Sequence, residues 1–172
     1  MDENKLKIFE LKRNECKAYK ITLLKEEGIF LTELEKQLIN SEDILTIAYQ
    51  DTKGIWTNGV GHTAGVVEGQ NIDIQTAIKL LRKDIQIAKN DCIKLFKNFD
   101  NLSDIRKSCL IEMAFNLGYK NLSKFKKTIH YINMGEFVRA GLEMLDSDWH
   151  REDVKKRAAR IAESFADDRR VY

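Results

Sequence analysis

The sequence predicts a predominantly helical α+β protein, in which a small lobe with an antiparallel hairpin is joined by a long helix to a larger helical lobe. Three observations support this fold class. Apolar residues recur at helical spacing over most of the chain after residue 73. Short β-type segments separated by glycine-containing turns lie between residues 45 and 67. The chain of 172 residues contains no proline and no low-complexity linker that would divide it into independent parts.

The first thirty residues are the least regular part of the sequence. Apolar residues alternate on both sides of a polar stretch at 13–15, which favours a hairpin, and one or two helices are the alternative. Charges recur every few residues and no apolar stretch resembles the core of a signal peptide. We therefore expect neither a signal peptide nor a membrane anchor.

The small lobe is expected to begin with a helix over 31–41 that runs up to Glu42. Apolar residues recur at helical spacing in LTELEKQLINS, and Thr32 and Glu35 have the spacing of a capping box. From Leu45 to Val67 the pattern changes to the segments LTIAYQD, GIWTNGVG and GVVEG. These segments predict a small antiparallel sheet of two or three strands.

The rest of the chain is expected to be helical. A long helix begins near Asp73, with an apolar stripe over about five turns formed by Ile74, Ala77, Ile78, Leu81, Ile85, Ala88 and Cys92. The next helix follows Ser103, and its segment CLIEMAFNLG is apolar on almost every side, which predicts burial in a helical bundle. Shorter amphipathic helices are expected at about 122–133, 136–146 and 152–166.

We divide the chain into an N-terminal extension, 1–30, and one domain, 31–172. Within this domain we expect a small lobe at about 31–72, a connecting helix at about 73–97 and a helical lobe at about 98–172, with a cleft between the lobes.

Composition excludes several classes of function. Lys and Arg number 29 against 27 Asp and Glu, a balance too even to predict a nucleic-acid partner. Three cysteines without a CxxC pair predict reduced packing residues rather than a disulfide framework. His130 and His150 lack the spacing of metal ligands, so we expect no metal and no cofactor.

Three residues near the predicted hairpin have side chains suited to glycoside hydrolysis. Glu42 closes a helix, Asp51 follows nine residues later, and Thr57 lies six residues beyond Asp51. Two carboxyl groups facing each other across a gap allow one to protonate the leaving oxygen and the other to activate water or attack directly. Gly59 and Gly61 would leave room for a polymer to approach the backbone. Taken singly, each of these residues also has an ordinary structural interpretation, as a solvated helix end or a turn.

The segment EDILTIAYQDTKGIWTNGVGHT resembles the signature of the bacteriophage-type lysozymes, the endolysin muramidases of glycoside hydrolase family 24. The resemblance continues in EMAFNLG, around Trp149 and in KRAARIAESF, and covers about residues 31–166. It implies a lysozyme-like fold and a glycoside hydrolase that cleaves the β-1,4 bond between N-acetylmuramic acid and N-acetylglucosamine in peptidoglycan, with inversion.

The resemblance also implies a role for individual residues. Glu42 is expected to be the general acid, Asp51 the carboxylate that positions or activates water, and Thr57 the hydroxyl that holds this water. The expected saccharide contacts are Gly61, Phe115, Asn116 and Thr128. Similarity further suggests that Arg157 orients Glu42, and that His62 pairs with Asp84 in a contact that holds the fold.

Three features depart from the family pattern. Asp43 follows the predicted acid where glycine is usual, and it could raise the Glu42 pKa or simply face solvent. Lys53 stands where an acidic residue is common and Asp148 where a basic one is, so we expect a compensating ion pair between them. The third departure is the extension 1–30, which could bind the cell wall, contact a partner or cover one lobe.

We therefore expect an endolysin that opens peptidoglycan at the end of phage infection. It would act as a monomer, stay in the host cytoplasm, and depend on a holin to reach the wall. A lytic transglycosylase is the nearest alternative, although Asp51 and Thr57 argue against it. A non-catalytic wall-binding or phage structural protein on the same fold is the other.

Overall fold

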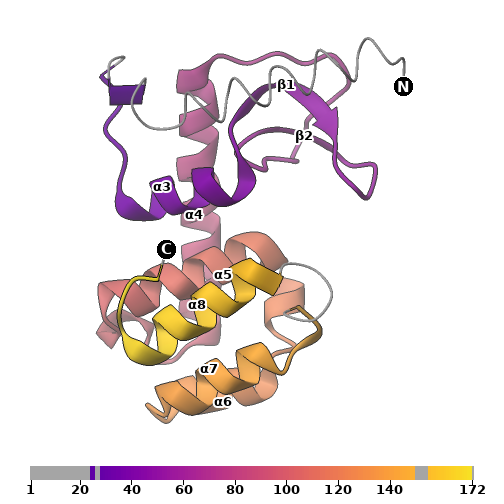
Figure 1. The fold of residues 1–172 in the computed structure, drawn as a ribbon. Coiled ribbons are helices and arrows are strands. Elements are labelled where there is room, and N and C mark those ends of the chain that lie inside the picture. The colour runs from indigo at the N-terminus through magenta and orange to yellow at the C-terminus, as the bar shows by residue number, and fades with distance from the viewer. Residues whose placement is uncertain (1–23, 26–27, 150–154, 172) are drawn as a thin grey trace. The chain divides into compact units, whose positions relative to one another are not determined.

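The computed structural model describes residues 24–25, 28–149 and 155–171 (Figure 1). The chain forms two compact units, Met1–Asp84 and Ile85–Tyr172, and each is described by itself. Among the described residues, the first contains a helix, a two-stranded sheet and the first half of a long helix, and the second is helical. This confirms the predicted class of a predominantly helical α+β protein. The alternatives for 1–23 lie outside the described residues, and the division at residue 30 stays a prediction.

Helix α3 spans Glu33–Glu42 and ends at the predicted acid, as expected. The capping box is present: the Glu35 amide donates to Thr32 Oγ1 at 3.3 Å, and the Thr32 amide donates to Glu35 Oε2 at 2.7 Å. The helix stops because Asp43 adopts a positive φ of 66°, while its amide still donates to the Ile39 carbonyl at 2.9 Å. These two caps fix where the side chain of Glu42 leaves the backbone.

Strands β1 (Leu45–Gln50) and β2 (Trp56–Gly59) form an antiparallel sheet, with Tyr49 opposite Thr57. The sheet thus has two strands, one of the two numbers predicted, and GVVEG does not add a third among the described residues. Gly65 and Gly69 have φ values of +74° and +75°, so this stretch turns instead of extending.

Helix α4 spans Ile74–Leu95, close to the predicted 73–97. Asp73 caps its first turn by accepting the Thr76 amide at 2.6 Å, and hydrogen bonds from Thr76 lower the pKa of the Asp73 carboxyl. The predicted stripe is largely buried, at Ala77, Ile78, Leu81, Ala88 and Cys92. Within the part of the chain that the structure describes, neither α4 nor any other helix is long and apolar enough to cross a membrane.

The second unit contains α5 (Asp104–Leu122), α6 (Lys126–Asn133), α7 (Phe137–Leu145) and α8 (Lys155–Asp167), preceded by a short 3₁₀ turn at Phe99–Asn101.

Helix α5 has the burial that its sequence predicted, because every residue from Cys109 to Ala114 is buried. The helix expected from residue 122 begins at Lys126 instead, since α5 continues past a non-helical Gly118 to Leu122. Helix α8 packs on both α5 and α7, so these helices share the core of the unit.

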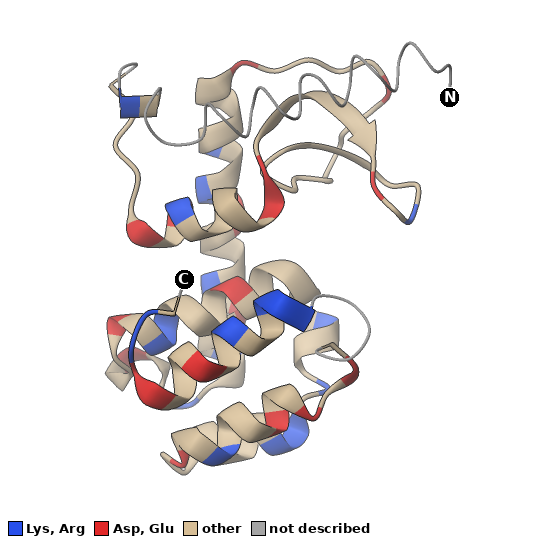
Figure 2. Ribbon diagram, in the orientation of Figure 1, with Lys and Arg blue, Asp and Glu red and all other residues tan. Residues whose placement is uncertain are grey.

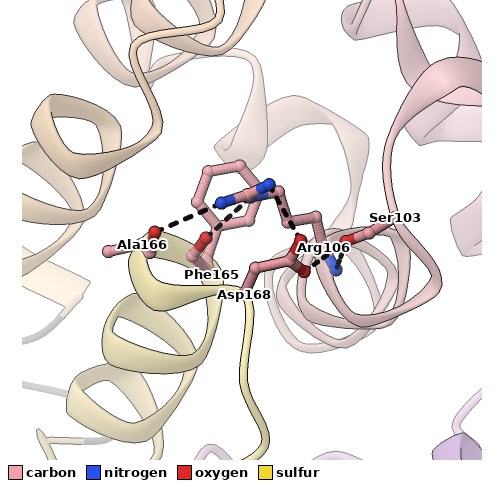
Figure 3. Close-up of polar contacts among 5 residues, drawn as sticks. All are labelled: Ser103, Arg106, Phe165, Ala166 and Asp168. Atoms are coloured by element: carbon pink, nitrogen blue, oxygen red, sulfur yellow. Dashed lines mark hydrogen bonds and ion pairs between the residues drawn. The ribbon is translucent and has the colours of Figure 1, made fainter.

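Arg106 of α5 holds the end of α8 (Figure 3). Its guanidinium donates to the carbonyls of Phe165 and Ala166 at 3.0 and 3.2 Å and to Asp168 Oδ2 at 3.0 Å. The same group stacks 3.9 Å from the centre of the Phe137 ring. One planar side chain thus satisfies the last carbonyls of α8 and joins this helix to α5.

Candidate functional site

Glu42, the predicted acid, is half-buried at the end of α3, and the backbone of Gly61 lies against its side chain. A methyl group added at Gly61 would lie 3.5 Å from Cγ, Cδ and Oε2 of Glu42. Gly61 also has a φ of +70°, which favours glycine. Gly61 therefore places no side-chain atom against the Glu42 carboxyl group.

The loop that carries Gly61 is closed at its base and anchored to α4. Asn58 and His62 exchange two backbone hydrogen bonds of 2.9 Å. The predicted contact is present, since His62 Nδ1 lies 2.7 Å from Asp84 Oδ2, while Nε2 lies 3.0 Å from the Ala64 carbonyl. The ring of His62 thus lies between the carboxylate of α4 and a carbonyl of its own loop. His62 thus links the loop of Gly61 to α4, and its fold-holding role stays a prediction.

Asp51 follows β1 and is half-buried. Its Oδ1 accepts the amides of Lys53 at 2.9 Å and Ile55 at 2.8 Å, so this oxygen closes the hairpin turn. Oδ2 accepts no hydrogen bond from the residues that the structure describes. Oδ1 of Asp51 thus stabilises the turn, while Oδ2 is able to accept a hydrogen bond from a water molecule or a substrate.

Thr57 lies in β2 and is 3% exposed. Its hydroxyl donates to the Ile55 carbonyl at 3.0 Å, and the same carbonyl accepts the Asp51 amide at 2.9 Å. The structure therefore brings Asp51 and Thr57 together at one residue, Ile55. Sequence reasoning missed Ile55, because it contributes only backbone groups and its side chain type carries no signal.

Asp43 is buried, so the alternative in which it faces solvent is wrong. Its φ of 66° and ψ of 171° belong to a region that is essentially confined to glycine. This conformation gives a physical reason for glycine at the position after the acid.

Three of the expected saccharide contacts lie in the second unit, and they differ in how deeply they are buried. Phe115 is half-buried on α5, and the neighbouring Asn116 accepts the Trp149 indole N–H at 2.8 Å. Trp149 also meets the edge of the Phe125 ring, with the ring centres 6.3 Å apart. Thr128 is 2% exposed, and this burial disfavours direct contact with a sugar.

Two further predictions concern charged residues. Arg157 belongs to the first half of α8, which Figure 2 shows to be basic while the second half is acidic. The expected contact of Arg157 with Glu42, and that of Lys53 with Asp148, would each join the two units, and both stay predictions.

A buried ion pair lies in the second unit, between α5 and α8. Glu112, buried in α5, accepts a hydrogen bond from Arg160 of α8, and nothing in the sequence reasoning singled out this pair. Among the described residues, no three His, Cys, Asp or Glu side chains gather closely enough to hold a metal ion.

The chain is similar in sequence to known proteins. The family model for phage lysozyme matches residues 40–162. A probable T4-type lysozyme 2 from Dictyostelium discoideum is 28% identical over 147 residues, covering 68% of this chain and 84% of the relative. A probable T4-type lysozyme 1 from the same organism is 26% identical over 133 residues, covering 60% of this chain and 76% of the relative. A SAR-endolysin of Haemophilus phage HP1 is 28% identical over 88 residues, which cover 51% of this chain and 47% of that protein. The chain therefore belongs to the phage lysozyme family.

Proposed function

We propose that this lysozyme is a muramidase that hydrolyses the β-1,4 bond between N-acetylmuramic acid and N-acetylglucosamine in bacterial peptidoglycan. One observation carries the proposal: Asp51 and Thr57 are hydrogen-bonded to the same residue, Ile55, within the compact unit that also contains Glu42. An acid, a carboxylate and a hydroxyl are the groups that glycoside hydrolysis through a bound water requires.

Glu42 acts as the general acid and protonates the glycosidic oxygen as the bond breaks. The position of Gly61 supports this role, because it places no side-chain atom between the Glu42 carboxyl group and an approaching glycan. Asp51 acts as the base towards a water molecule that Thr57 helps to hold. Hydrolysis then inverts the anomeric centre, which requires the two carboxyl groups to be about 6.5–9.5 Å apart.

The family supports peptidoglycan as the substrate, and the contacts and the route that follow are part of the proposal. Gly61, Phe115 and Asn116 contact the glycan. The enzyme acts as a monomer, accumulates in the cytoplasm of the host bacterium, and reaches the wall after a holin has permeabilised the membrane. Matches to the phage lysozyme model and to a protein named a SAR-endolysin support a peptidoglycan-degrading lysozyme, and the holin-dependent route is our proposal.

Digestion of purified sacculi tests the activity. We expect the wild-type protein to release muropeptides with reducing N-acetylmuramic acid ends, detected by mass spectrometry. Glu42→Gln should abolish this release, because an amide has no proton of suitable acidity to give to the leaving oxygen. Glu33→Gln is the matched control, since Glu33 lies on the same helix and is half exposed.

Two results would contradict the proposal. Anhydro-muropeptides as the main product would identify a lytic transglycosylase. Undiminished release by Glu42→Gln would remove the proposed acid.

A further inference from the structure

The hairpin fixes the hydrogen-bonding polarity of the proposed water site. We propose that Ile55 is a positioning residue whose backbone makes Thr57 and Asp51 act only as hydrogen-bond acceptors towards the attacking water. This inference rests on the proposed function. It adds a residue that the reaction scheme above does not use, and it assigns a direction to each hydrogen bond.

The hydroxyl group of Thr57 has one proton and two lone pairs. The proton is directed to the Ile55 carbonyl, 3.0 Å away. At 3% exposure, the side chain also has little contact with solvent that could compete for this proton. Towards any other neighbour, the hydroxyl oxygen therefore accepts and does not donate.

The backbone amide of Ile55 holds the carboxylate of Asp51 in place. The Ile55 amide donates to Oδ1 at 2.8 Å, and the Lys53 amide donates to the same oxygen at 2.9 Å. These two donors hold the orientation of the carboxylate and leave Oδ2 for the reaction. Ile55 thus holds both groups at once, one through its N–H and the other through its carbonyl.

A water molecule between two acceptors has to donate both of its protons, which leaves an oxygen lone pair to face the sugar. In the reaction this oxygen forms a bond to the anomeric carbon while the glycosidic C–O bond breaks. The bonding electrons pass to the leaving oxygen, which takes the proton of Glu42. One proton of the water passes to Oδ2 of Asp51, and the other remains on the new hydroxyl group.

Methanol fits a site with two acceptors less well than water, because its hydroxyl group has one proton and can donate to only one of the two acceptors. Wild-type enzyme in dilute methanol should therefore give mainly hydrolysed ends and few methyl glycosides. Thr57→Val removes one acceptor while conserving shape. We expect it to lower the ratio of hydrolysis to methanolysis about three- to tenfold, the value of one neutral hydrogen bond.

Mass spectrometry gives this ratio from the products of a long digestion, so a slow variant remains measurable. Thr57→Ser should restore the wild-type ratio. An unchanged ratio in Thr57→Val would overturn the inference and leave the hydrolytic function intact. Anhydro ends in the wild-type digest would overturn the proposed function itself, and the water site with it.

Two further measurements address Ile55 directly. Ile55→Pro removes the amide that holds Asp51 and keeps the carbonyl, so kcat should fall at least tenfold with little change in KM, while Ile55→Val should match the wild type. A folded Ile55→Pro enzyme with unchanged kcat would contradict the role.

The second measurement, NMR on the wild-type protein, does not depend on the folding of a variant. The Thr57 hydroxyl proton should exchange slowly compared with that of the exposed Thr52. Equally fast exchange would refute the assigned polarity.

Discussion

Replacement of Asp43 tests whether the end of α3 is strained next to the proposed acid. A non-glycine residue at φ 66° and ψ 171° costs about 1–3 kcal/mol of folding free energy. Glycine at this position releases the strain. Relative to alanine it also costs about 0.4–1 kcal/mol of folding free energy, because glycine has more conformational freedom in the unfolded chain. Asp43→Ala retains the strain and also lacks the carboxylate. We therefore expect Asp43→Gly to be more stable than Asp43→Ala by about 1–2 kcal/mol.

The assay is urea unfolding followed by circular dichroism and tryptophan fluorescence, with coincident transitions required for a two-state treatment. A difference of this size corresponds to about 2–8 °C in Tm for a protein of this length. Comparison of two variants that both lack the carboxylate isolates the backbone contribution, since they share the loss of every contact that Asp43 makes.

Asn40, an exposed residue within α3, provides a control of opposite sign. Its backbone is helical, so Asn40→Ala should be more stable than Asn40→Gly by about 1 kcal/mol. If Asp43→Gly proved no more stable than Asp43→Ala, the strain argument would fail. The proposed explanation for glycine after the acid would fail with it.

Three other predictions concern a loop glycine, a helix-joining arginine and a buried thiol. Gly61→Ala and Gly65→Ala both place a side chain at positive φ, so each should lower the unfolding free energy by about 1 kcal/mol. Only Gly61→Ala should also lose activity, because its new methyl group would meet Glu42 while open space surrounds Gly65. Equal activities of the two variants would refute this expectation. Arg106→Lys should lower the unfolding free energy, measured by urea titration, by about 2–3 kcal/mol. Arg139→Lys is the control, because Arg139 forms an exposed ion pair with Glu136, and it should change the unfolding free energy by less than about 0.5 kcal/mol. Burial raises the pKa of the Cys109 thiol from its ordinary value of 9.0 to about 12 in the folded protein. As pH rises, the unfolded chain therefore loses this proton before the folded protein does, and the unfolding free energy falls above pH 9.0. Cys109→Ala should reduce that slope by up to about 1.4 kcal/mol per pH unit, and an unchanged slope would contradict the assignment.

The helix ends and the hairpin could be predicted from the sequence because their signals are local. Thr32 and Glu35 stand at capping-box spacing, and the structure contains both hydrogen bonds of that box. Asp73 and Ser103 likewise begin α4 and α5. In each case a polar side chain three residues before a free amide specifies the boundary, and no distant contact is needed.

Predictions failed or fell short where backbone conformation or burial decides. Positive φ angles at Gly65 and Gly69 turn a segment that has strand-like composition. Burial of Thr128 depends on which side of α6 meets the core, and periodicity over eight residues specifies this poorly. The role of Ile55 rests on an amide and a carbonyl that every non-proline residue possesses, so no residue type could have revealed it.

The hydrogen bonds of Ile55 also explain why the spacing of Asp51 and Thr57 is strict. Asp51 closes the turn by accepting the amide four residues later, and Thr57 donates to the carbonyl two residues before it. An inserted residue between 51 and 55 would move the Ile55 amide away from Oδ1. Because side chains alternate along a strand, a one-residue shift in β2 would also turn Thr57 to the opposite face. The geometry that closes the hairpin is thus the geometry that assembles the proposed water site, and selection for either one would preserve both.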